Sequence, residues 1–136
     1  MDVIKSLRAT GAALQADERY IKYSLAREKN DNDAALQEII GEFNLARIEL
    51  SRSISSENKD EDKLKKTDAR VSELYKKIME NENMINYTAA KAEMDALIKE
   101  MNGLLKLFID GESPETCQYK PSCNEGGCAG CKSSCK

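Results

Sequence analysis

The amino-acid sequence predicts an all-α protein: an antiparallel bundle of four to five helices followed by an irregular tail rich in cysteine and glycine. Two features of the composition favour this class, since 33% of the residues are charged and only 5% are aromatic. Such a mixture suits long amphipathic helices better than a β-sandwich or a barrel. Apolar residues also recur at steps of three and four as far as Ile109, and no segment shows the alternation of a strand.

The first part of the chain predicts three helical segments. Asp17 suits the N-cap of the second segment, because its carboxylate can accept hydrogen bonds from first-turn amides. The run Asn-Asp-Asn-Asp at residues 30–33 predicts a break followed by the cap of a longer helix. The three apolar stripes consist of Val3, Ile4, Leu7, Gly11 and Leu14; of Tyr20, Ile21, Tyr23 and Leu25; and of Leu36, Ile39, Ile40, Phe43, Ala46, Leu50 and Ile54.

The second part predicts a hairpin turn and two further helices. Residues 55–63 contain no apolar side chain and predict the turn, and residues 81–83 predict a break in which Asn83 caps the last helix. Gly111 stands where a C′ glycine ends a helix, and Pro114 prevents the helix from resuming. The two stripes consist of Leu64, Thr67, Val71, Leu74, Tyr75, Ile78 and Met79; and of Tyr87, Ala90, Met94, Leu97, Ile98, Met101, Leu105, Phe108 and Ile109.

Composition divides the chain into a helical domain at residues 1–111 and a cysteine-rich tail at residues 112–136. Both prolines and most of the glycines lie at or after Gly111. From Cys117 onward three lysines face one acid, so the acidic excess of the chain, whose net charge is −3, lies in the residues before Cys117. An acidic body is a poor candidate for binding nucleic acid through its phosphates, so we expect no direct nucleic-acid contact.

The sequence also predicts the cellular compartment of the protein. No segment approaches the roughly 20 apolar residues of a membrane span, and residues 1–8 lack an apolar signal core. We therefore expect no membrane insertion and a cytoplasmic location. Thiols stay reduced there, so clustered cysteines are interpreted as metal ligands before disulfides, and their odd number, five, agrees with this.

All five cysteines lie in the tail, with the spacing C-x5-C-x4-C-x2-C-x3-C. Cys128-x2-Cys131 is the recurring half-site of thiolate sites, because two intervening residues let both sulfurs point inward. Five thiols exceed the four ligands of such a site, and Cys117, which lies nearest to the bundle and is set apart by Pro121, is left out first and kept as an alternative ligand. We assign the four-thiolate site to Cys123, Cys128, Cys131 and Cys135.

The spacing alone leaves the occupant of this site open. A structural zinc site usually joins two knuckles separated by a dozen or more residues. The crowding of the thiols between residues 117 and 135 suits an iron–sulfur cluster or an intersubunit site better. A third interpretation is a tail without metal that responds to redox conditions.

The sequence does not predict an enzyme. It contains no histidine and therefore lacks the usual general base, and it has no phosphate-cradling loop or nucleophile–base pair. Thioredoxin-type use of Cys128-x2-Cys131 would need a helix N-terminus in an α/β fold, so a thiol redox enzyme is the least favoured class. The acidic run at residues 60–62 is interpreted as a solvated turn. Aromatic and sulfur-containing residues of the stripes are interpreted as core or interface groups: Tyr20, Tyr23, Tyr75, Tyr87, Met79, Met94 and Met101.

The order of these features resembles one family of small bacterial regulators, the YlbF/YmcA family. The resemblance covers roughly residues 3–111 and depends on the order and spacing of several motifs. These motifs are Gly11-x2-Leu14, Asp17-Glu-Arg-Tyr20, Asn30-Asp-Asn-Asp33, Ile40-x2-Phe43, Asn81 with Asn83-x3-Tyr87-x2-Ala90, Met94-x2-Leu97-x3-Met101-Asn102, and Ile109-x-Gly111.

The resemblance implies a function. Members of that family are helical and associate with themselves or with each other, and some members similar to YlbF end in a Gly- and Cys-rich tail. In Bacillus-type relatives they form a complex with YmcA and a third partner. That complex carries iron–sulfur clusters, acts on competence, sporulation and biofilm formation, and adjusts the specificity of ribonuclease Y.

By this resemblance the chain is expected to be a non-enzymatic regulatory adaptor. Its partners would be other YlbF/YmcA-type subunits and a ribonuclease complex, in a homo- or hetero-oligomer. Combined with the spacing, the resemblance favours a 4Fe-4S iron–sulfur cluster on the four assigned cysteines. The alternative is a structural helical interaction module whose tail binds zinc or is unliganded and redox-sensitive.

Overall fold

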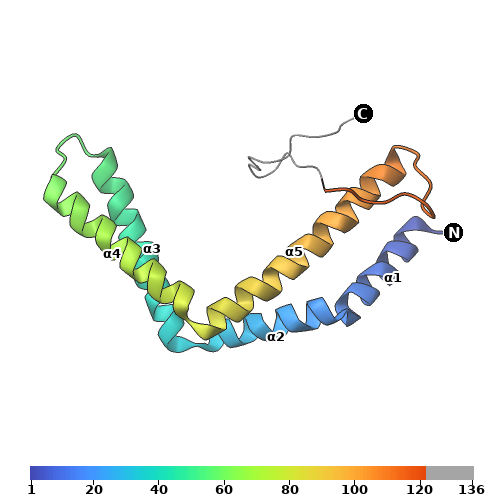
Figure 1. Cartoon of the computed structure of the whole chain (residues 1–136), viewed down its shortest axis with the longest axis horizontal. Coiled ribbons are helices and arrows are strands. Elements are labelled where there is room, and N and C mark those ends of the chain that lie inside the picture. The colour runs from blue at the N-terminus through green and yellow to red at the C-terminus, as the bar shows by residue number, and fades with distance from the viewer. Residues whose placement is uncertain (122–136) are drawn as a thin grey trace, which may run out of the picture. The chain divides into compact units, whose positions relative to one another are not determined.

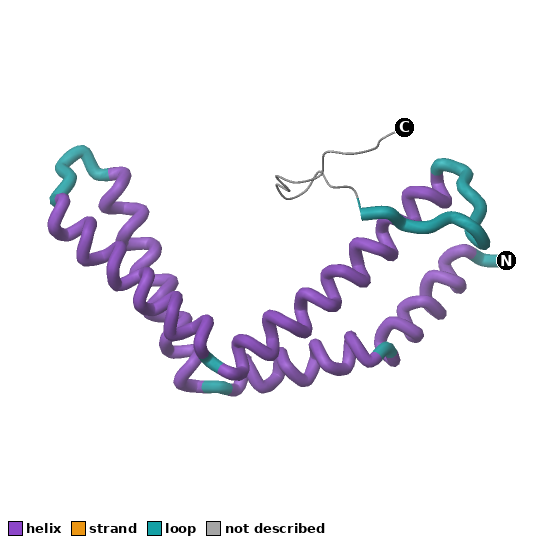
Figure 2. Tube along the Cα trace, in the orientation of Figure 1, coloured by secondary structure: helices purple, strands orange, loops and turns teal. Residues whose placement is uncertain are grey.

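The computed structural model describes residues 1–121, and this part of the chain contains helices and connecting segments but no strand (Figure 2). The all-α class is therefore confirmed for these residues, and the predicted irregular tail beyond them lies outside the description. Within the described residues five helices follow one another (Figure 1): α1 (Val3–Ala16), α2 (Glu18–Asn32), α3 (Ala34–Ser55), α4 (Glu61–Glu80) and α5 (Glu82–Ile109).

Internal contacts divide the chain into two compact units, Met1–Met94 and a second unit that begins at Asp95, within α5. Each unit is described by itself. The domain division expected at residue 111 stays a prediction.

Aspartate N-caps start the first four helices, as short polar side chains do when they accept hydrogen bonds from free first-turn amides. Asp17 accepts from the Arg19 amide at 2.8 Å, and Asp33 accepts from the Leu36 amide at 3.0 Å. Both predicted caps are confirmed. The break expected over residues 30–33 is shorter than predicted, because α2 continues through Asn32 and Asp33 alone separates it from α3.

The predicted cap of α5 was wrong by two residues. Asn81, not Asn83, is the cap: its side-chain oxygen accepts from the Met84 amide at 3.1 Å, and its backbone is extended. Glu82 then occupies the first turn, where a negative charge is favoured by the helix dipole. Asn83 lies inside the helix, and its side chain is used for a contact with another helix.

Helices α3 and α4 form an antiparallel hairpin in the first unit, joined by a short loop (Figure 1). The predicted turn at residues 55–63 is narrower than expected, since Asp60 caps α4 and thereby starts it at Glu61. Leu36 is fully buried. Thr67 is also buried, and its hydroxyl donates a hydrogen bond to the Lys63 carbonyl at 2.9 Å. The buried side chains of the hairpin are Leu36, Ala46, Thr67, Leu74 and Ile78.

The C-terminal end of α5 lies in the second unit. Gly111 has a φ of 90°, which only glycine adopts without strain. Its amide donates to the Phe108 carbonyl at 3.2 Å, and the Glu112 amide donates to the Leu107 carbonyl at 2.9 Å. This pair of bonds is the Schellman arrangement, and it confirms Gly111 as the C′ residue.

No helix within residues 1–121 combines the length and the apolar content that crossing a membrane requires.

Candidate functional site

Cys117 is the one predicted thiol ligand that falls within the described residues. It is a free, half-buried cysteine at the end of a turn, and its amide donates to the Ser113 carbonyl at 2.9 Å. The four preferred ligands lie outside the described residues, and their assignment stays a prediction: Cys123, Cys128, Cys131 and Cys135.

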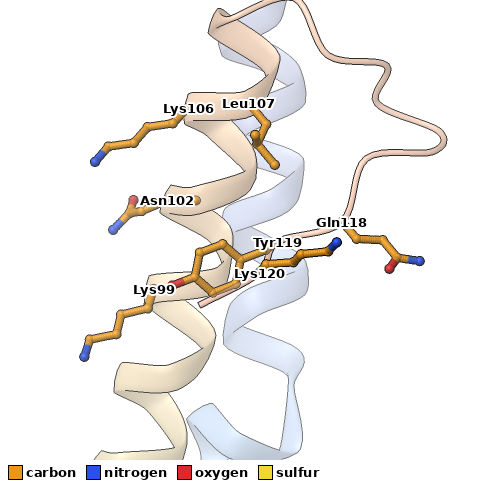
Figure 3. Close-up of a pocket in the computed structure, with 8 residues that line it drawn as sticks. Lys99, Asn102, Lys106, Leu107, Gln118, Tyr119 and Lys120 are labelled. Carbon is orange, nitrogen blue, oxygen red and sulfur yellow. The ribbon is translucent and has the colours of Figure 1, made fainter. Parts of the chain in front are cut away.

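The turn at residues 113–117 reverses the chain after α5. The Thr116 amide also donates to the Ser113 carbonyl, at 3.2 Å, which closes the turn. Residues 118–120 then run back along α5 (Figure 3). The segment that leads to the predicted ligands therefore begins on the surface of α5.

A ring-on-glycine contact holds this returning segment. The Tyr119 ring lies directly on Gly103 of α5, so that a Cβ built on Gly103 would overlap the ring atoms (Figure 3). Glycine costs about 1 kcal/mol in a helix interior relative to alanine. At position 103 the packing of the Tyr119 ring against the bare backbone offsets this cost, because any side chain there would exclude the ring. This packing explains a glycine in the middle of a long helix.

A cavity of about 580 Å³ surrounds this contact, and its wall is basic and polar. Three lysines line it, and no acidic residue does. No ion pair involves any of these lysines among the described residues. The wall consists of Lys99, Asn102, Gly103, Lys106, Leu107, Gln118, Tyr119 and Lys120, and we call it the lysine pocket.

Acidic side chains in residues 1–121 do not form a metal site. No group of three or more histidine, cysteine, aspartate or glutamate side chains in this part of the chain is placed to hold an ion. The run at residues 60–62 is exposed, as expected, and it serves the start of α4. Asp60 is the cap, and Glu61 and Asp62 lie in the first turn, where the helix dipole favours them.

Two sequence motifs of the first unit meet at a polar joint. The Asp33 carboxylate accepts from the side-chain amides of Asn83, at 2.9 Å, and Asn81, at 3.3 Å. It thereby ties the α2–α3 junction to the α4–α5 junction. Its pKa is lowered, first by the hydrogen bond from the Leu36 amide and then by those from the two asparagines. The ionised carboxylate is therefore the form that the joint binds.

A second layer supports the joint from α2. Asn30 is only 5% exposed, and its carbonyl accepts from the Gln37 side-chain amide at 2.9 Å. The side-chain amide of Asn30 donates to the sulfur of Met84 at 3.8 Å. The residues of these two motifs thus satisfy one another's polar groups, and their role is structural.

The tyrosines differ in their surroundings. Tyr23 of α2 and Tyr87 of α5 pack with ring centroids 5.8 Å apart. Burial, and after it a hydrogen bond with Tyr23, raises the pKa of the Tyr87 phenol above its usual value. This pair matches the expected core or interface role. Tyr75, by contrast, is 54% exposed, and the centroid of its ring lies 6.0 Å from that of Phe43.

The α3–α4 hairpin also exposes apolar side chains. Leu45 and Ile48, one turn apart on α3, are 70% and 49% exposed, and Met79 of α4 lies one turn after the exposed Tyr75. Single exposed apolar residues are ordinary, but grouped ones characterise surfaces that contact other proteins. The oligomeric state itself stays a prediction.

The lysine pocket was not predicted from the sequence. Its two α5 lysines look like solvated charges in the chain, and Tyr119 lies beyond the last apolar stripe. The available signal was Gly103, because a lone glycine inside a strong helix pattern often marks a close approach.

Comparisons with known proteins give one match. The family described as control of competence regulator ComK, YlbF/YmcA, matches residues 3–107. No curated protein and no solved structure matches the chain. The matched region includes all five helices except the last two residues of α5. The chain therefore belongs to the YlbF/YmcA family of regulators of competence.

Proposed function

We propose that this chain is a non-enzymatic adaptor that acts inside a protein complex and modulates ribonuclease Y-dependent RNA processing, and through it competence, sporulation and biofilm formation. The observation that carries the proposal is membership of a regulator family over residues 3–107. The ribonuclease link comes from the resemblance of the chain to YlbF-like members with a cysteine tail.

The surface of the hairpin supports an adaptor role. Leu45, Ile48 and Tyr75 present apolar area to solvent on an antiparallel pair of helices. Burying such area against another YlbF/YmcA-type subunit would release water from it, at roughly 25 cal/mol per Å². The partners proposed are thus other subunits of this kind and a ribonuclease complex.

The proposal includes a 4Fe-4S cluster on the tail, held by Cys123, Cys128, Cys131 and Cys135. The donor set fits, because four thiolates are the usual ligands of such a cluster, and a chain without histidine offers no nitrogen ligand of that kind. When bound, the cluster would supply sensitivity to oxygen and redox state. The described residues would supply the anchor, since Tyr119 on Gly103 fixes the chain four residues before Cys123.

The alternative is a structural helical interaction module whose tail binds zinc or no metal. The same four thiolates can hold zinc tetrahedrally. The iron and zinc content of the purified protein separates the two proposals.

The regulatory role is tested in the native host. The gene is deleted, and the 5′ ends of transcripts processed by ribonuclease Y are mapped before and after complementation. We expect altered processing in the deletion strain, restored by the wild type. The variant Leu45→Asp/Ile48→Asp is expected to fail to restore it, whereas Lys65→Gln/Lys66→Gln on the exposed side of α4 is expected to succeed. Unchanged processing in the deletion strain would overturn the ribonuclease part of the proposal.

A further inference from the structure

We propose that the lysine pocket of the second unit binds a small ligand that carries a chain of two or three phosphate groups. No cysteine of the described residues lines it. It is formed by α5 and by the segment that returns across it.

The charge of the pocket points to an anion. Lys99, Lys106 and Lys120 line it without an acidic neighbour in the wall and without an ion-pair partner among the described residues. The second unit nevertheless carries acids at Glu100 of α5 and at Asp110, directly after the helix. The positive groups are therefore gathered in the pocket, and acids are kept out of it.

The spacing of the lysines points to more than one phosphate. Lys99 and Lys106 are seven residues apart, which places them on one face of α5 and about 10 Å apart along its axis. Figure 3 shows both side chains extending from the same side of the helix, with Asn102 between them. A di- or triphosphate can reach from one ammonium group to the other with both side chains extended, whereas a single phosphate would require them to bend toward each other.

The polar groups between the lysines suit such a ligand. The Asn102 amide can donate to a bridging or terminal phosphate oxygen. The hydroxyl end of Tyr119 points toward the side of α5 that carries Lys99 and Lys106 (Figure 3). Because Gly103 holds the ring, this hydroxyl is positioned before any ligand binds.

The size of the pocket favours a small molecule over a nucleic acid. A volume of about 580 Å³ falls within the range of about 300–1,000 Å³ typical of small-ligand pockets. Within residues 95–121 the three lysines of the pocket are the only lysines or arginines, so this part of the second unit offers no further cation that would follow an RNA strand.

The test is a titration of the full-length protein with two probes, inorganic tripolyphosphate and a nucleoside triphosphate, followed by calorimetry. We expect saturable one-to-one binding of both, and weaker binding of inorganic phosphate. The variant Lys99→Gln/Lys106→Gln is expected to bind at least about tenfold more weakly, because two charge-assisted contacts are lost. Lys99→Arg/Lys106→Arg keeps both charges and is expected to bind within about threefold of the wild type.

The matched control is Lys65→Gln/Lys66→Gln, which removes two exposed lysines of α4 and is expected to bind like the wild type. Circular dichroism confirms that each variant is folded. The proposal is overturned if neither probe binds, if the Lys99→Gln/Lys106→Gln variant binds as tightly as the wild type, or if only single-stranded RNA binds, with an affinity that grows with its length.

Discussion

The carboxylate of Asp33 accepts a hydrogen bond from the side-chain amide of Asn83 at 2.9 Å and so joins residues that lie fifty positions apart in the chain. The same carboxylate caps α3 through the Leu36 amide. One side chain thus starts a helix and connects two helix junctions. This double role makes Asp33 the residue whose loss most directly loosens the joint.

The first prediction concerns this residue. Asp33→Ala removes the cap of α3 and leaves the Asn81 and Asn83 amides without their acceptor, so the urea midpoint of unfolding is expected to fall clearly. Asp33→Asn keeps an acceptor oxygen and is expected to have a smaller effect. Urea titration followed by circular dichroism measures both.

Its control is Asp31→Ala, two residues earlier on the exposed side of α2. Among residues 1–121, Asp31 forms an ion pair only with Arg27, at 3.7 Å and with both side chains largely exposed, so its removal should leave the midpoint nearly unchanged. An Asp33→Ala midpoint equal to that of Asp31→Ala would show that the joint contributes nothing to stability.

The second prediction separates core from surface in the hairpin. Leu36 is fully buried, so Leu36→Ala is expected to lower the free energy of unfolding by about 2–5 kcal/mol, from lost burial and from the cavity left behind. Leu45 is 70% exposed, and Leu45→Ala is expected to change the free energy of unfolding by about 0.5 kcal/mol or less. Both values come from urea unfolding at low protein concentration, and equal losses would contradict the placement of these side chains.

The third prediction concerns acid pH. The hydrogen bond from the Arg19 side chain, and next that from the Arg19 amide, lowers the pKa of Asp17 from 3.8 to about 2, and the pKa of Asp33 is lowered as well. A carboxylate with a lowered folded-state pKa stabilises the fold above its unfolded pKa, near 3.9, and this contribution is lost as pH falls toward the folded value. Stability should therefore decrease between about pH 5 and pH 2.

Asp17→Asn tests this assignment, because an asparagine still caps α2 but does not titrate. Its stability is expected to depend less steeply on pH than that of the wild type over the same range. Thermal unfolding at a series of pH values measures the slope, and identical slopes would exclude Asp17 as a source of the acid sensitivity.

The fourth prediction concerns the anchor of the returning segment. A methyl group at position 103 overlaps the Tyr119 ring, so Gly103→Ala is expected to release residues 118–120 from α5. Chymotrypsin should then cleave after Tyr119 faster than in the wild type, as followed by intact mass.

Gly41→Ala is the matched control, since nothing lies within 4 Å of a Cβ at that helical position. This variant should leave cleavage after Tyr119 unchanged and stabilise the protein by about 0.5–1 kcal/mol through the higher helix propensity of alanine. Equal cleavage rates in the two variants would mean that the ring is not held by Gly103.

Local chemistry made several features of the fold predictable from the sequence. Asp17, Asp33 and Gly111 act within one turn of their own position, so the chain around each residue already contains its partners. The choice of Asn81 over Asn83 as the cap of α5 was not predictable in this way. Both side chains can cap, and Asn83 is instead used by Asp33, which reaches it from another part of the chain.

Periodicity also says which residues share a face but not what covers that face. Ile54 belongs to the same predicted stripe as Leu36, yet it is 53% exposed and Leu36 is buried. The lysine pocket was missed for a related reason, because it exists only where Tyr119 returns across Gly103. Neither relation is local in sequence.

The most direct test of the proposed cluster-bearing adaptor is the iron, sulfide and zinc content of the full-length protein purified without oxygen. We expect iron and acid-labile sulfide in equal amounts, visible absorption, retention of both in Cys117→Ser, and their loss in Cys128→Ser/Cys131→Ser. Colourless protein without iron, even after anaerobic cluster reconstitution, or protein with stoichiometric zinc in its place, would contradict the proposal.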